Sequence, residues 1–230
     1  KQFGVQIAGG DTNVSAFAKA PVVSVTAYGS VAKGAELRTG HAGPGMDLIL
    51  SKWVGLEGTA ILARRFRETL LARYPAYLID DAAALEQLLS VIPEAAIAMK
   101  SGVCAMHDVS RGGIFGALWE FAESAGVGLN IDMKKIPLRQ ETVEVCEWLN
   151  VNPYELLSGG CLLMAAPDGE KIVDALMNQG ICATIIGVTT DKKERVLINE
   201  DEFTVYIRML SAVPTLTLTQ LPLTFFQHMF

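Results

Sequence analysis

The stretch His107-Asp108-Val109-Ser110-Arg111-Gly112-Gly113 joins a short apolar run, residues 103–106, to a helical pattern over residues 114–125. A strand, a glycine turn and a helix in this order form an anion-binding arrangement, because the free amides at the helix start point toward the turn. Glycines let the backbone approach an anion closely, and a carboxylate suits the magnesium ion that accompanies a polyphosphate. The stretch therefore predicts a phosphate and metal site.

A second stretch with the same chemistry lies near the start of the chain. An expected strand over residues 3–8 runs directly into Gly9-Gly10-Asp11-Thr12, again a glycine pair beside an aspartate and a hydroxyl. Neither stretch matches a Walker loop or a dinucleotide fingerprint. We expect the two turns to converge in space on one triphosphate and its metal.

Outward from these turns, strand and helix patterns alternate along the chain. We expect an α/β fold, with strands over 21–29, 47–54, 127–131, 160–165, 183–188 and 195–198, and helices over 58–74, 114–125, 141–149 and 169–180. A further helix has an apolar face that ends at Pro93, and the pair Asp80-Asp81 is interpreted as its cap. Three glycines and a proline lie within residues 40–45, which predicts a linker or turn and the start of a second unit.

Composition and charge argue against two classes of partner, nucleic acids and membranes. Half of the 230 residues are apolar, the net charge is −6 and the pI is near 5.1. An acidic chain lacks the general attraction to phosphate backbones that nucleic-acid binding uses, so we expect no nucleic-acid partner. No apolar stretch is long enough for a membrane helix, and the four separated cysteines indicate small buried thiols in a cytoplasmic protein.

Four motifs, taken in order, resemble the aminoimidazole ribonucleotide (AIR) synthase superfamily. They are Gly9 to Thr12, Pro44-Gly45-Met46-Asp47, Met106 to Gly113, and Ser158-Gly159-Gly160. The turn at Asp108 to Gly113, with Ile136-Pro137-Leu138-Arg139 downstream, most resembles HypE-like members, which serve hydrogenase maturation.

The resemblance covers residues 1 to about 208 and implies a domain plan. Residues 1–40 correspond to the end of the ATP-binding amino-terminal domain, and residues 41–208 to a PurM-like carboxy-terminal domain with a mixed sheet and packed helices. Residues 209–230 form a tail, either an edge strand or an unstructured end. Since the aspartate-rich ATP motif of the family lies upstream of the first turn, we expect the natural protein to extend before Lys1.

The resemblance also implies a dimer that binds Mg-ATP near the domain junction. Asp11 would contact magnesium or a bridging water, while Gly9, Gly10 and Thr12 would shape the phosphate turn. The residues that would face the Gly9 turn from the other domain are Asp108, Arg111, Gly112 and Gly113. A surface ion pair is an alternative role for Arg111. His107 is interpreted as a packed or capping side chain, not as a catalytic base.

Three functions remain open at this point. The first is a HypE-like enzyme in which ATP phosphorylates an amide or carbonyl oxygen of a small molecule or protein. The second is a small-molecule kinase similar to thiamine-monophosphate kinase. The third is a non-catalytic assembly module, which is favoured by the ending His228-Met229-Phe230 in place of the terminal cysteine that HypE carries.

Overall fold

The computed structural model describes residues 5–17, 21–199 and 204–207, in two compact units, Lys1–Glu36 and Leu37–Phe230. In the first unit, the described residues form no helix or strand, so the strands expected over 3–8 and 21–29 are wrong for that part. The reason is physical: alternating apolar residues make a strand only when a neighbouring strand pairs with them. The expected tail, 209–230, lies outside the described residues.

A seven-stranded sheet organises the described part of the second unit, in the order β2-β4-β1-β5-β3-β6-β7. Its strands are β1 (Asp47–Ser51), β2 (Ala105–Val109), β3 (Gly128–Asp132), β4 (Cys161–Ala166), β5 (Ala183–Thr190), β6 (Arg195–Ile198) and β7 (Thr204–Tyr206). β3 and β6 run parallel, whereas the other neighbours pair antiparallel. The sheet is mixed, as expected.

Helices cover both faces of this sheet. Leu48 and Leu50 of β1 belong to one core with α5 (Gly113–Ala125), while Ile49 between them belongs to another core with α4 (Ile92–Ser101) and α7 (Gly169–Met177). Successive strand residues point to opposite faces, so α5 lies on one side and α4 with α7 on the other. This layering places the start of α5 beside the end of β2.

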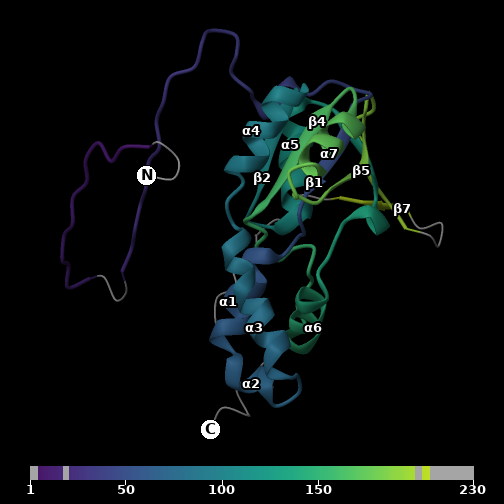
Figure 1. Ribbon diagram of the computed structural model, residues 1–230. Helices are drawn as coiled ribbons and strands as arrows, with labels where there is room; N and C mark the ends of the chain where they lie inside the picture. The colour runs from purple at the N-terminus through teal and green to yellow at the C-terminus, as the bar shows by residue number, and fades with distance from the viewer. Residues whose placement is uncertain (1–4, 18–20, 200–203, 208–230) are drawn as a thin grey trace. The chain divides into compact units, whose positions relative to one another are not determined.

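The remaining helices form a separate group, which Figure 1 shows beyond one end of the sheet. This helical group consists of α1 (Leu56–Arg65), α2 (Arg67–Leu71), α3 (Ala76–Ala84) and α6 (Gln140–Leu149), with a 3-10 turn, η2 (Leu85–Leu88). Its own core is built from α1, α2, α3 and α6, with Leu70 and Ile79 fully buried. Two further 3-10 turns are η1 (Thr39–His41) and η3 (Met133–Lys135).

Three details of the helices differ from expectation. The helix expected over 58–74 breaks at Phe66, whose φ of −109° and ψ of 25° are not helical. Pro93, interpreted as a helix end, instead lies in the first turn of α4, where its missing amide costs nothing. Asp80 and Asp81 lie inside α3, so they do not cap a later helix that ends at Pro93; Asp80 pairs with Arg67 on the surface.

Across the described residues, no single helix has both the length and the apolar character needed to span a membrane. One pair, Ala76–Leu88 with Ile92–Ser101, meets that test only when taken together, and it is bent by 53°.

Candidate functional site

The Asp108 turn, residues 108–113, runs from Asp108 and Val109, the last two residues of β2, to Gly113, the first residue of α5. Asp108 and Arg111 are exposed, whereas Gly112 and Gly113 are buried. Gly113 has a left-handed φ of 61°, and a Cβ there would overlap the carbonyl oxygen of Tyr154 and lie 2.8 Å from the carbonyl carbon of Glu155. Glycine is therefore required at residue 113. The charged side chains of Asp108 and Arg111 are accessible to solvent.

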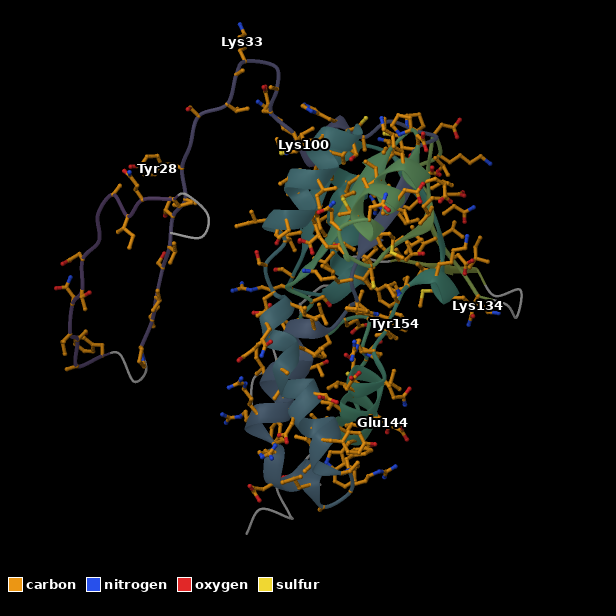
Figure 2. The ribbon with its side chains drawn as sticks, in the orientation of Figure 1. Tyr28, Lys33, Lys100, Lys134, Glu144 and Tyr154 are labelled. Atoms are coloured by element: carbon orange, nitrogen blue, oxygen red, sulfur yellow. The ribbon has the colours of Figure 1, made fainter. Side chains whose placement is uncertain are left out.

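The segment over the start of α5 is held in place by its own contacts. Tyr154 stacks on Phe115 with ring centroids 5.4 Å apart and an interplanar angle of 16°. The Phe115 amide donates to the Tyr154 carbonyl at 3.4 Å. In Figure 2, Tyr154 lies between the sheet and the helical group. The Asp108 turn is thus closed on one side by aromatic packing.

The Ser158 turn, Ser158-Gly159-Gly160, joins the Asp108 turn to the start of α1. The Ser158 amide donates to the Ser110 carbonyl at 3.2 Å, and the Ser158 hydroxyl donates to the Leu156 carbonyl at 2.6 Å. The same hydroxyl oxygen accepts the amide of Gly55, the residue that caps α1, at 2.8 Å. Ser158 is fully buried, so each of these bonds is protected from water.

A second carboxylate enters this junction from α1. Glu57 is half-buried, and its carboxylate occupies the space that a side chain at Gly159 would need. The Gly58 amide donates to the Leu157 carbonyl at 2.8 Å, which fixes the first turn of α1 against the same segment. The segments that meet at this junction therefore carry three charged side chains, half-buried Glu57 and exposed Asp108 and Arg111.

A buried ion pair lies behind the Ser158 turn. Lys52 Nζ is 2.6 Å from Glu94 Oε1, and the two side chains are only 8% and 2% exposed. The same ammonium donates to the carbonyls of Leu88 at 2.7 Å and Ser90 at 2.8 Å. A lysine so deeply buried is uncommon unless it is paired, as it is here.

His107 belongs to the sheet face covered by α5. Its Nε2 lies 3.1 Å from Glu120 Oε2, and its Nδ1 lies 3.3 Å from the hydroxyl of Thr39. That hydroxyl also donates to the Met106 carbonyl at 3.0 Å. These contacts agree with a packed side chain, and the side chain is only 20% exposed.

The cysteines fall into two groups. Burial raises the pKa of the Cys146 and Cys161 thiols to about 12, so both are protonated at neutral pH. Cys104 is half-buried and Cys182 is exposed, which corrects the expectation that all four are buried.

The Gly9 turn, residues 9–12, belongs to the first unit and is described by itself. Its residues are exposed, and the Asn13 side-chain amide donates to Asp11 Oδ2 at 2.6 Å. A Cβ at Gly9 or Gly10 would meet no atom within 4 Å. The convergence of this turn with the Asp108 turn stays a prediction.

Over residues 5–17, 21–199 and 204–207, no group of three His, Cys, Asp or Glu side chains is placed to hold a metal ion.

Comparison with known proteins decides the family. The description "AIR synthase related protein, C-terminal domain" matches residues 43–199, more than half of the chain. The chain belongs to the AIR synthase related proteins. The match covers β1 to β6 and contains both the Asp108 turn and the Ser158 turn.

Relatives of this AIR synthase related chain include proteins named HypE. Carbamoyl dehydratase HypE of Rhodobacter capsulatus is 36% identical over 169 residues, covering 73% of this chain and 47% of that protein. The crystal structure of HypE from E. coli matches with a TM-score of 0.59 at 25% identity, covering 78% of this chain and 54% of that one. A HypE structure in complex with ATP matches with a TM-score of 0.58 at 18% identity, covering 77% and 54%, and so shows likeness of fold. The chain spans about half the length of these relatives.

Sequence reasoning identified two of the three segments at the junction and missed Glu57. A signal was present, because Gly55-Leu56-Glu57-Gly58 also sets a carboxylate between glycines. The buried Lys52–Glu94 pair had no comparable signal, since its two charges lie on separate elements.

Proposed function

We propose that this chain is part of an ATP-dependent enzyme of the HypE type, which transfers the γ-phosphoryl group of ATP to an amide or carbonyl oxygen. That oxygen then leaves as phosphate, which dehydrates a primary amide. Support comes from the relatives named carbamoyl dehydratase and from the junction that the Ser158 turn holds together. The observation that carries the proposal is the placement of exposed Arg111 and Asp108 on a turn fixed from both sides.

The accessible groups of the junction have the chemistry that Mg-ATP requires. The Arg111 guanidinium offers a planar fork of donors that binds phosphate oxygens in pairs. Asp108 and Glu57 provide oxygen ligands of the kind that magnesium prefers. Magnesium usually keeps waters and substrate phosphates in its coordination sphere, so a site with few protein carboxylates fits it.

ATP supplies the activated phosphoryl group, and the residues of the chain position it and neutralise charge as it transfers. We assign Arg111 to a phosphate group, and Asp108 with Glu57 to the metal side of the junction. For the Gly9 turn, taken by itself, we propose that Asp11 contacts magnesium and that Gly9, Gly10 and Thr12 shape a phosphate-binding backbone.

Calorimetric titration with Mg-ATP tests this assignment in the natural full-length protein. We expect Arg111→Met to weaken binding by about tenfold or more, because a hydrogen bond to a charged group contributes about 1.5–3 kcal/mol. Arg67→Met is the matched control, since Arg67 is also a surface arginine but pairs with Asp80 in the helical group. Absence of wild-type binding, or equal losses in both variants, would contradict the proposal.

Product analysis separates the enzymatic alternatives. Free phosphate together with a dehydrated amide supports the HypE-type reaction. A stable phosphorylated metabolite favours a kinase instead, and binding without turnover favours an assembly module.

We also infer that the enzyme works as a homodimer in the cytoplasm. In the first unit, Val22, Val23, Val25 and Tyr28 are 83–88% exposed, which is unusual for large apolar side chains set so close together. A second copy that pairs with this segment would bury them. Sedimentation equilibrium is expected to give twice the chain mass, and Val23→Lys with Val25→Lys to reduce it to one; a wild-type monomer would count against the dimer.

A further inference from the structure

Lys52 combines two costly features. Its φ of 54° is left-handed, a conformation that a residue with a side chain rarely adopts. Its ammonium group is also almost fully removed from water. Structures keep such features when the surroundings hold the residue in place and the residue has a task there.

The partners of Lys52 account for all three protons of its ammonium group. One goes to Glu94 Oε1, and the other two go to the carbonyls of Leu88 and Ser90. The second carboxylate oxygen, Glu94 Oε2, is buried and accepts no hydrogen bond from the described residues. Lys52 is therefore the cation that pairs with the buried Glu94 carboxylate, and its three hydrogen bonds tie the segment between η2 and α4 to the end of β1.

This segment lies directly against the Ser158 turn. A Cβ on Gly160 would be 3.0 Å from the Leu88 carbonyl oxygen and 3.1 Å from the Leu89 Cα. The Leu88 carbonyl oxygen that accepts a hydrogen bond from Lys52 Nζ therefore also packs directly behind Gly160. A shift of residues 88–90 would remove this packing contact with Gly160.

Neighbours of Lys52 in sequence hold both ends of the same turn. The Ser51 hydroxyl accepts the Leu162 amide at 3.0 Å, just after the turn, and the Gly55 amide donates to Ser158, at its start. Ser51 and Ser158 are fully buried. Residues 51 and 55 therefore contact the two ends of the Ser158 turn, while Lys52 bonds the segment that lies behind it.

We propose that Lys52 is a positioning residue for nucleotide binding. It fixes residues 88–90 behind Gly160, and so sets the Ser158 turn, which in turn holds the Asp108 turn through the Ser158 amide and the Ser110 carbonyl. The inference rests on the proposed function for its link to ATP, but the positioning of the turn is testable without nucleotide.

Amide hydrogen exchange measured by NMR on the natural full-length protein tests the positioning. Lys52→Met leaves Glu94 buried without its cation and risks unfolding the protein, so the decisive variant is Lys52→Met with Glu94→Leu. A buried ion pair replaced by apolar residues of similar volume usually preserves the fold. The matched control is Arg64→Met with Glu86→Gln, which removes an exposed ion pair between α1 and η2.

In the Lys52→Met, Glu94→Leu protein we expect the amides of residues 158–162 to exchange about tenfold faster or more, because their local opening is eased. Residues 171–177 of α7 should keep their protection, as should the whole control protein. The dissociation constant of Mg-ATP should rise by a similar factor in the double variant and stay unchanged in the control.

Two results would overturn the inference. One is unchanged exchange at residues 158–162 in the folded double variant, and the other is faster exchange there with unaltered Mg-ATP affinity. A wild-type protein that binds no Mg-ATP refutes the proposed function, whereas the exchange data still decide whether Lys52 positions the turn.

Discussion

Replacement of Gly113 by alanine separates two costs that normally occur together. Gly113 begins α5 with a φ of 61°, and Gly126, which ends the same helix, has a φ of 67°. An added Cβ at residue 126 meets no atom within 4 Å, whereas at residue 113 it overlaps the backbone of Tyr154 to Leu156. The two variants thus share the conformational cost, and only one has the steric cost.

The magnitudes follow from these contacts. A left-handed conformation costs a residue with a Cβ about 1–2 kcal/mol, which is the expected loss for Gly126→Ala. Overpacking adds about 1–3 kcal/mol, and more when the obstacle is backbone, so Gly113→Ala should lose about 2–5 kcal/mol in total. The obstacle at residue 113 is formed by carbonyl groups of a closed segment, which cannot rotate away as a side chain does.

Urea denaturation followed by far-UV circular dichroism measures both losses, and unchanged slopes with denaturant would show that the comparison is valid. Gly113→Ala should also weaken Mg-ATP binding, because it displaces the segment that packs on the Asp108 turn, while Gly126→Ala should not. Equal free energies of unfolding for the two variants would refute the close packing of residues 154–156 on the start of α5.

Three further predictions concern the buried ion pair and the thiols. Lys52→Met should lower the free energy of unfolding by about 3–5 kcal/mol, because it leaves a buried carboxylate without its cation. Adding Glu94→Leu should restore most of that loss. A double variant no more stable than Lys52→Met would contradict this. Burial raises the pKa of the Cys161 thiol from 9.0 to about 12. The contribution of the protonated thiol to folding stability is therefore fully present below pH 9, where Cys161 is protonated in both the folded and the unfolded chain. Above pH 9 the unfolded chain releases this proton first, so the free energy of unfolding should fall as the pH rises toward 12, and a Cys161→Ala protein should show a smaller fall. At pH 8 a thiol reagent should modify exposed Cys182 readily in the native protein and leave Cys161 unmodified.

Much of the second unit was predictable because its signals are local. The glycine pair at residues 112 and 113 marks the end of β2 and the start of α5, and the structure confirms both elements. The apolar runs that became β3, β4 and β6 were also found within one or two residues of their bounds.

The misses arise where the decisive contact is distant in sequence. Phe66 and Leu70 are both buried with helical spacing, so the pattern runs through a break that only the backbone reveals. A proline both ends and begins helices, and nothing local to Pro93 distinguishes the two. A lysine between apolar residues suggests exposure, and only Glu94, on another element, makes the burial of Lys52 possible.

The candidate site was likewise predictable where its signals are local in sequence and was missed where they depend on distant contacts. The Asp108 and Ser158 turns were recognised from their own residues, but their hydrogen bond through Ser110 depends on how β2 and β4 pair. Glu57 was missed because its relation to Gly159 exists only after α1 packs against the Ser158 turn. The Gly9 turn lies in the other unit, and its part in the site is proposed from its chemistry.

The most direct test of the account is an amide chemical-shift map of the natural full-length protein, titrated with magnesium and a non-hydrolysable ATP analogue. We expect the largest chemical-shift changes at residues 9–12, 108–113 and 158–160, and no change at the exposed control surface around Arg67. Saturable binding that leaves all three turns unperturbed would contradict it.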